Sequence, residues 1–218
     1  MEVVTTLNRY KYEAFRWRYE ASWAKKLALA LGMACVTGLV AQLRIQLPWS
    51  PVPIVGTHLG IFLAAVLLGR WWGGASIAIY AALGFAGVPW FAGLSGGVGV
   101  LVGATGGYII GFIPAALFVG YFTDRYIRAR SFLTMFGLML FASYVLIYVP
   151  GLLGLGMWLH FVQGEAFSLW QLLWMGAIPF IPGDAIKSAI IAAAARGITP
   201  KVAYNGEVDR GRKFWRVP

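Results

Sequence analysis

Charged residues are scarce in this chain: Asp, Glu, Lys and Arg make up only 12% of its 218 residues. A soluble domain of this length has roughly twice that share of charge, so the composition argues against a soluble globular fold. Hydrophobic residues account for 60% of the chain, a surplus typical of an integral membrane protein. The length fits a single membrane domain.

Cysteine and histidine are also scarce. Cys35 is the only cysteine, which excludes an internal disulfide or a cysteine-rich metal site, and we expect it to be a small buried hydrophobe. His58 and His160 stand alone, without partners at metal-ligand spacing, so we predict neither a metal site nor a cofactor. Phosphate-loop, H-E-x-x-H and G-x-S-x-G motifs are absent. The chain is therefore predicted to have no catalytic residues and no ATPase site.

Acidic residues are outnumbered, with eight against 18 basic ones and a formal net charge of +10. In a soluble protein this balance would suggest nucleic acid. Here the basic residues are confined to short segments between long uncharged runs, which indicates membrane topology. We predict a lipid bilayer around the chain and no nucleic-acid partner.

The uncharged runs locate the first membrane spans. Leu27–Leu43 is just long enough for one helix. Three prolines place a loop at 46–56, because proline belongs at a helix start or in a loop, and a second helix is expected at 57–69. The uncharged run that follows Arg70 has room for two more spans.

The remaining spans are marked by breaks in the apolar pattern. A glycine-rich connection at Gly87–Gly103 separates the third and fourth helices. The fifth is expected within Ser131–Gly164. The sixth extends from Ser168 to Gly197 and is broken at Pro179–Asp184, a break tolerated at membrane depth only inside protein or beside a cavity.

The basic residues fall almost entirely on one side of these spans, with Arg44 and Lys187 as the two exceptions. By the positive-inside rule, both termini are cytoplasmic and the three proline- and glycine-rich loops are external. The predicted fold class is an all-α, multi-pass protein of the cell membrane, with six transmembrane helices in residues 27–197.

The two ends of the chain differ from the membrane domain. Residues 1–26 are basic and aromatic, without the apolar core of a cleavable signal peptide. Tyr12, Phe15, Tyr19 and Trp23 recur at helical spacing, which suits a helix lying in the membrane interface or a plain orientation anchor. Residues 198–218 form a short polar cytoplasmic tail whose composition is compatible with poor order.

One pair of charges lies inside the predicted membrane domain. Asp184 and Lys187 are three residues apart and share one helix face, and Asp184, after Pro182 and Gly183, suits an N-cap. Charges at membrane depth are costly and usually functional. Together they would bind a neutral polar ring with both donors and acceptors, or form a structural ion pair beside an ordinary cap.

Small residues recur every four positions in two places. Ala30, Ala34 and Gly38 form a stripe that suits either internal packing or a partner subunit, and the absence of a nucleotide site led us to expect the partner. Gly107 and Gly111 are expected to allow close helix packing. The aromatic and glycine-rich loop before them suits either a cover over a small ligand or an ordinary connection.

Four ordered segments resemble the BioY family, the biotin-specific subunits of energy-coupling factor transporters. Pro51-Val-Pro-Ile-Val-Gly-Thr-His-Leu-Gly60 is similar to PVPITGQTLG, and Gly87-Val-Pro-Trp-Phe-Ala-Gly93 to G-x-P-V-F-A-G. Gly103-Ala-Thr-Gly-Gly-Tyr-Ile-Ile-Gly-Phe112 is similar to GPTGGYLIGF, and Pro179-Phe-Ile-Pro-Gly-Asp-Ala-Ile-Lys187 to PFLPGDLLK. The match runs in order from about Ala28 to Arg196.

The resemblance implies biotin bound from the outer side under the first and third loops, and docking to a membrane coupling subunit driven by two ATPase subunits. The stripe of Ala30, Ala34 and Gly38 would face that coupling subunit. The ligand contacts would come from the matching segments: Asp184, Lys187, Tyr108, Phe91, Thr57, His58 and Trp90.

The sequence departs from the family pattern at four positions. Thr57 and His58 stand where the family has Gln and Thr, Ala104 replaces a proline, and Trp90 is bulkier than the usual valine. These departures leave open a sister subunit for another small vitamin. An intramembrane enzyme would need a catalytic group matched to a base or metal, and a solute channel would need polar residues along several helices.

Overall fold

The computed structural model describes residues 2–209 of the chain. Within that part, five helical stretches are long and apolar enough to cross a membrane: Trp23–Ala41, Thr57–Phe85, Gly106–Arg125, Phe132–Phe161 and Leu169–Ile198. The structure therefore agrees with a helical membrane protein. It joins the second and third predicted helices into one element, so the described spans number five where six were expected.

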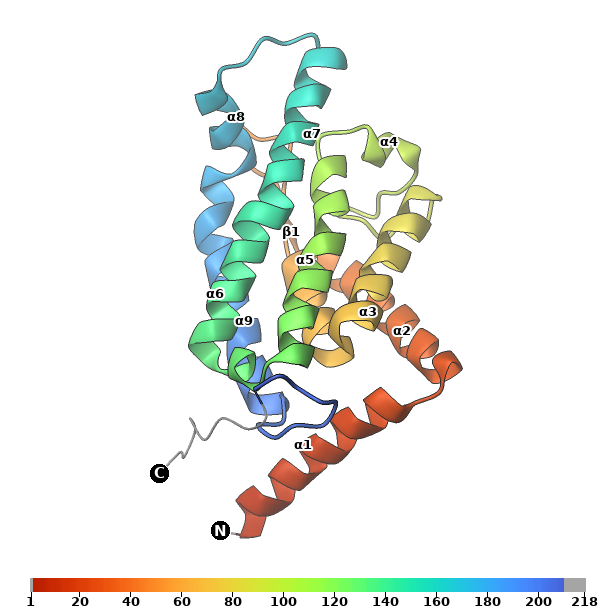
Figure 1. Ribbon diagram of the computed structural model, residues 1–218. Coiled ribbons are helices and arrows are strands. Elements are labelled where there is room, and N and C mark those ends of the chain that lie inside the picture. Colours follow the sequence, from red (N-terminus) through yellow and green to blue (C-terminus); the bar gives the residue numbers. More distant parts are fainter. Residues whose placement is uncertain (1, 210–218) are drawn as a thin grey trace.

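The elements follow one another with short connections. In chain order they are α1 (Glu2–Glu20), α2 (Trp23–Ala41), β1 (Arg44–Ile45), β2 (Ile54–Val55), α3 (Thr57–Phe85), α4 (Val98–Leu101), α5 (Gly106–Arg125), the 3₁₀ turn η1 (Ile127–Arg130), α6 (Phe132–Phe141), the π-helical turn η2 (Ala142–Ile147), α7 (Tyr148–Phe161), α8 (Leu169–Gly176), η3 (Ile178–Phe180) and α9 (Ile181–Ile198). Figure 1 shows α5, α6, α7 and α9 running along the bundle, with α1 crossing obliquely below its lower end.

The joined helix α3 bends at Gly69, where the backbone leaves the helical region (φ 75°, ψ −168°). The Asp124 carboxylate occupies the space beside this glycine, because a Cβ there would lie 2.2 Å from its Oδ2 atom. The same Oδ2 atom accepts a hydrogen bond from the Arg70 backbone N–H at 2.8 Å. Only glycine combines this conformation with so close a neighbour, and the bend falls where the second helix was predicted to end.

The middle of the bundle is α5, which packs along α3 and α7. A Cβ at Gly107 would lie 2.2 Å from the Pro150 carbonyl oxygen, and one at Gly111 would lie 2.6 Å from that of Leu146. The predicted role of these glycines in close helix packing is therefore confirmed.

The small-residue stripe of α2 lies inside the protein. Ala30, Ala34 and Gly38 are buried, and a Cβ on Gly38 would come within 3.0 Å of Trp90. The expectation that this stripe forms an open docking surface is wrong, because α2 turns it toward α3 and the following loop. Cys35, expected to be buried, is exposed on another face of α2.

Two local predictions also need correction. The loop after α2 contains a small antiparallel sheet, with Arg44 opposite Val55 and Ile45 opposite Ile54, so the fold is not purely helical. In the last span, the helical geometry breaks at Ala177 (φ −137°, ψ −59°) and α9 already begins at Ile181. Asp184 therefore lies within the first turn of α9 rather than at its N-cap.

The tail after α9 is folded against the end of the bundle next to α1 (the α1 end) as far as the structure describes it. Arg130 and Glu207 are both buried there, with their Nη2 and Oε1 atoms 2.5 Å apart. Arg18 of α1 donates to Asp124 at 3.0 Å and to the Tyr204 hydroxyl at 2.9 Å. Residues 198–209 are thus well bonded, unlike the poorly ordered tail that the composition allowed, and the predicted tail beyond residue 209 lies outside the described residues.

Candidate ligand-binding site

A cavity of about 240 Å³ lies in the half of the bundle away from α1. This volume is near the lower end of the range of small-molecule sites. Its walls come from the loop between α2 and α3, the loop between α3 and α5, and the first turns of α3, α5 and α9. The helix starts therefore meet at one place, closed over by two loops.

The first of these loops (residues 42–56, loop 1) is held by side-chain bonds to the backbone. The Ser50 hydroxyl donates to the Met175 carbonyl at 2.6 Å and accepts from the Val52 N–H at 3.0 Å. Gln46 donates to the Ser50 carbonyl at 2.8 Å. These bonds attach loop 1 to the end of α8 and aim Val52, Pro53 and Ile54 into the cavity.

The second loop (residues 86–105, loop 3) is held by the side chain of Gln42. Its amide nitrogen donates to the carbonyls of Trp90 at 3.0 Å and Phe91 at 3.1 Å, and its oxygen accepts from the Leu94 N–H at 3.0 Å. Phe91 points inward and seats itself on Gly84, where a Cβ would lie 2.1 Å from the ring. An amide with both donor and acceptor thus fixes the loop that closes the cavity.

Trp90 does not line the cavity, contrary to prediction. It packs on Gly38 of α2, and its indole N–H donates to the Tyr80 carbonyl at 2.9 Å. Neighbouring residues of an extended segment point to opposite sides, so Phe91 faces the cavity and Trp90 faces the helices. Trp90 therefore acts on the site only through Tyr80, which does line it.

Four polar side chains gather at the deep end of the cavity. The Lys187 ammonium lies 2.5 Å from Oδ1 of Asp184 and also donates to the Val55 carbonyl at 2.7 Å. Tyr148 donates to Oδ2 of Asp184 at 2.6 Å. Asp184 is only 2% exposed, so its charge depends on these partners.

His58 is the fourth member of this group, and its hydrogen-bonding capacity is not satisfied. Its Nε2 atom lies 3.4 Å from Oδ2 of Asp184, and in the described part of the chain neither ring nitrogen has a hydrogen-bond partner. Phe62 and Phe112 flank the ring at 6.1 and 5.9 Å between centroids. A buried polar group without a hydrogen-bond partner is costly, and His58 is one of the residues that line the cavity.

The side walls of the cavity are largely aromatic. Tyr80, Phe91, Phe112 and Phe180 contribute rings, and Tyr108 adds another. The Tyr108 hydroxyl donates to the Gly176 carbonyl at 2.7 Å, so it is already occupied and its ring serves as wall. An apolar body with a polar end is the usual design of a small-molecule site.

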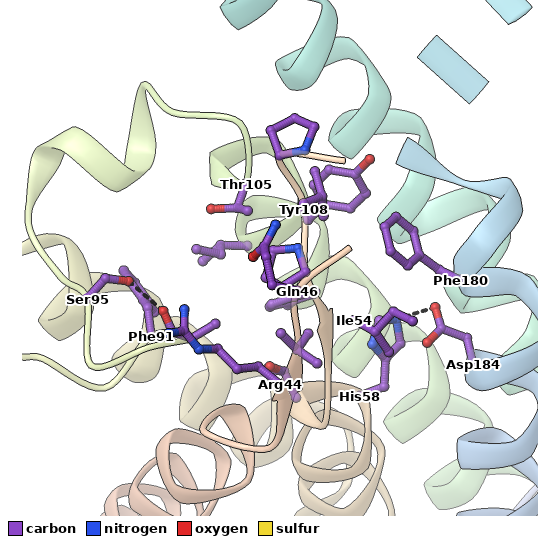
Figure 2. A pocket seen from close by; sticks show the side chains of 18 of the residues that line it. Arg44, Gln46, Ile54, His58, Phe91, Ser95, Thr105, Tyr108, Phe180 and Asp184 are labelled. Carbon is purple, nitrogen blue, oxygen red and sulfur yellow. Dashed lines mark hydrogen bonds and ion pairs between the residues drawn. The ribbon is translucent and has the colours of Figure 1, made fainter. Parts of the chain in front are cut away.

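Arg44 lies on the opposite side of the cavity from Asp184, as Figure 2 shows. Its guanidinium rests on Gly93, where a Cβ would lie 2.2 Å from Nη1. The backbone of Gly93 has φ 75°, so glycine is needed there on both counts. The cavity therefore has a cation near its mouth and a hydrogen-bonding cluster at depth.

Six of the seven predicted contact residues line the cavity: Asp184, Lys187, Tyr108, Phe91, Thr57 and His58. Sequence reasoning missed Arg44, Tyr80 and Tyr148. Arg44 had a visible signal, because it was one of two basic residues on the wrong side of the charge distribution. Tyr148 had none, since it reaches Asp184 from a helix 36 residues away.

The arrangement does not resemble a metal centre. Among residues 2–209, no group of three His, Cys, Asp or Glu side chains gathers at metal-binding distance. His160 lies near the end of α7, beside Phe161.

Known proteins resemble the chain in sequence and in fold. The model of the BioY family matches residues 10–204. The chain is 55% identical to the probable biotin transporter BioY of Methanothermobacter thermautotrophicus over 157 residues, which are 72% of this chain and all of that protein. It is 35% identical to the biotin transporter BioY of Rhodobacter capsulatus, over 74% of this chain and 90% of that one.

A solved structure is similar as well. The S-component for biotin from an ECF-type ABC transporter superimposes with a TM-score of 0.69 at 26% sequence identity. The match covers 79% of this chain and 89% of that one. The helix arrangement that surrounds the cavity is thus shared with a vitamin-binding membrane subunit.

Proposed function

Because the chain belongs to the BioY family, we propose that its cavity binds biotin tightly and that the protein is the substrate-specific subunit of an energy-coupling factor transporter. It is a multi-pass protein of the cell membrane, and it is a transport subunit rather than an enzyme. Biotin enters from the side of loop 1 and loop 3, which cover it.

The cluster of Asp184, Lys187 and His58 in the cavity wall carries this proposal, because His58 has no hydrogen-bond partner in the described chain. The ureido ring of biotin is neutral and offers N–H donors and a carbonyl acceptor. Asp184 accepts from an N–H of that ring, Lys187 donates to its carbonyl, and His58 gains the partner that it lacks in the described chain. A site with such unpaired groups rejects analogues that cannot bond them.

The rest of the ligand follows the remaining walls. The sulfur-containing ring and the aliphatic chain of biotin are apolar and lie among Tyr80, Phe91, Tyr108 and Phe180. The carboxylate at the end of the chain reaches Arg44, whose planar guanidinium suits a carboxylate.

The experiment that tests this assignment is equilibrium binding of labelled biotin to the purified protein, with other vitamins and a neutral biotin amide as competitors. Biotin should displace the label and the other vitamins should not. Arg44→Gln should weaken biotin while leaving the affinity for the neutral amide nearly unchanged. Displacement by a different vitamin at lower concentration would identify a sister subunit instead.

The proposed topology has six spans, with both termini in the cytoplasm and loop 3 outside. The bend at Gly69 supports it, because the arm before it and the arm after it correspond to the second and third predicted helices. In a Cys35→Ala background, an impermeant thiol reagent added outside intact cells should label a cysteine placed at Ser95 and not one at Ser131. Labelling at Ser131 but not at Ser95 would show that the protein has the opposite orientation in the membrane.

Energy must come from outside the chain, because no phosphate-binding motif is present. We propose a membrane coupling subunit and two ATPase subunits as partners, which agrees with the similarity to an S-component of an ECF-type ABC transporter. The exposed face of α2 is the proposed docking surface, in place of the buried stripe. Gly32 is open there, since a Cβ would meet no atom within 4 Å in the described chain, and Ala28 and Cys35 flank it.

A pair of tryptophan substitutions separates the two faces of α2. Gly32→Trp should leave biotin binding intact in the isolated subunit and block co-purification with the coupling subunit. Ala34→Trp, on the buried face, should damage folding and biotin binding first. Normal assembly and uptake by the Gly32 variant would show that α2 docks by another face or not at all.

A further inference from the structure

A second cavity of about 170 Å³ lies at the other end of the bundle, in the corner where α1 meets α2. Its lining has a polar side with Arg18 and Lys26 and an apolar side with Leu29, Leu68 and Trp72. α3 contributes the apolar side next to its bend. Neither the proposed biotin site nor the proposed docking face uses this corner.

The polar side keeps an excess of positive charge. Asp124 also borders the cavity, but its carboxylate is already bonded to Arg18 at 3.0 Å and to the Arg70 N–H at 2.8 Å. The Lys26 ammonium donates to the Tyr19 carbonyl at 2.7 Å, and within residues 2–209 it forms no ion pair with Asp124, which pairs with Arg18 instead. An ammonium has three donors, so Lys26 retains two for a further partner.

The apolar side lies at the level of a membrane–water interface. The rings of Trp23 and Trp72 meet edge to face with their centroids 6.1 Å apart, and Trp71 is 68% exposed. Tryptophan is enriched where lipid head groups meet the hydrocarbon core. The corner between the oblique helix α1 and the candidate membrane span α2 is visible on the lower right of Figure 1, and its tryptophans are of the type that contacts lipid head groups.

We infer that this corner binds the head group of an anionic phospholipid from the leaflet on the side of the chain termini. The phosphate accepts hydrogen bonds from Lys26, and the first carbons of the acyl chains run along Leu29 and Leu68. A phospholipid fits this lining because it combines an anionic group, which Lys26 can bind, with apolar chains, which can contact Leu29 and Leu68. The bound lipid would bridge α1, α2 and α3 and hold α1 at the interface.

The test compares two adjacent lysines. Lys26 lines the cavity, whereas Lys25 is exposed beside it. Purified protein would be stripped of lipid, mixed with phosphatidylglycerol or phosphatidylcholine, and measured by native mass spectrometry for bound lipid. Biotin binding reports on whether each variant is folded. We expect phosphatidylglycerol to bind in preference to phosphatidylcholine, and Lys26→Gln to reduce its binding about fivefold while Lys25→Gln changes it little and Lys26→Arg restores it.

Three outcomes would overturn the inference. Equal losses in the Lys25 and Lys26 variants would mean that only general surface charge attracts the lipid. Equal binding of the two lipids would remove the role of the anionic head group. Inorganic phosphate that competes phosphatidylglycerol away at millimolar concentration would make the corner an anion site rather than a lipid site.

Discussion

The two ends of this bundle both bury charged side chains, but they treat them differently. At the α1 end, Arg130 is 1% exposed and donates to the carbonyls of Thr123 and Pro200, both at 3.0 Å, and to Glu207 at 2.5 Å. Glu207 in turn accepts from the backbone N–H of Tyr204 at 3.1 Å. The group is closed, because nearly every donor meets an acceptor of the same chain.

At the cavity end, the group of His58, Tyr148, Asp184 and Lys187 is left incomplete. Asp184 has its partners, but the ring nitrogens of His58 have no hydrogen-bond partner in the described chain, although His58 lies in the cavity wall beside Asp184. Polar networks that are fully satisfied rigidify a fold, while partly satisfied ones carry a penalty that another group must remove. The contrast distinguishes a structural clamp, formed by Arg130 and Glu207, from the candidate binding site around Asp184. The sequence alone shows charged residues in both places.

The largest expected effect is a loss of stability when the buried pair of Arg130 and Glu207 is broken. Arg130→Met leaves the buried Glu207 carboxylate uncompensated, which should lower the free energy of unfolding by about 3–5 kcal/mol. Thermal unfolding of the detergent-solubilised protein measures this. Arg130→Met combined with Glu207→Leu removes both charges and should recover much of the loss. A single variant as stable as the parent would mean that the clamp is not structural.

Removing the ammonium from the binding site should act on affinity. Lys187→Ala should weaken biotin binding by about 2–5 kcal/mol, roughly 30-fold or more. The substitution removes the buried partner of Asp184, and it also removes a hydrogen-bond donor to the ligand. Equilibrium binding gives the dissociation constant, and Lys201→Ala, a change in the exposed tail, is the control. Unchanged affinity would exclude Lys187 from the site.

A smaller change tests how Asp184 is positioned. Tyr148→Phe removes the hydroxyl that donates to Asp184 and should cost about 1.5 kcal/mol, roughly tenfold in biotin affinity. Tyr144→Phe is the matched control, because its hydroxyl donates to the Ile181 carbonyl at 3.1 Å and Tyr144 is not among the described residues that line the cavity. Equal effects of the two variants would assign both hydroxyls to helix packing.

The smallest expected effect is a pH dependence of the stability that the pair of Arg130 and Glu207 contributes at the α1 end. Burial raises the pKa of the Glu207 carboxyl, but hydrogen bonds from Arg130 and from backbone N–H groups outweigh it and leave the pKa below its usual value. Since the folded-state pKa is the lower one, the clamp has its full stability above about pH 4.3 and loses it as the pH falls through the folded-state value.

Hydrogen exchange of residues 199–209 across this pH range would detect the release of the tail. Glu207→Gln should remove the pH dependence, while biotin affinity changes little because the cavity lies elsewhere. A tail that stays protected at low pH in the parent protein would show that the Arg130 contacts to backbone carbonyls hold it without the carboxylate.

Hydropathy and charge were reliable guides to the membrane spans because lipid imposes strict demands on composition. Residues near the predicted boundaries at Gly69 and Gly87–Gly103 do end or bend helices. The break in the last span was placed a few residues too late, because Pro182 is acceptable within the first turn of a helix. The short sheet of loop 1 escaped notice, since two paired residues on each strand leave no periodic signal.

The sequence by itself determined that the chain crosses a membrane, that Asp184 and Lys187 share one helix face, and which segments line the cavity. Only the tertiary structure decided which face of each element points inward. Spacing of four residues describes a stripe but not its direction, so Ala34 proved buried while Gly32 stays open. The contacts of Tyr148 with Asp184 and of Tyr204 with Arg18 could not be predicted either. Contacts between distant segments depend on how the helices pack, and no local sequence pattern contains that information.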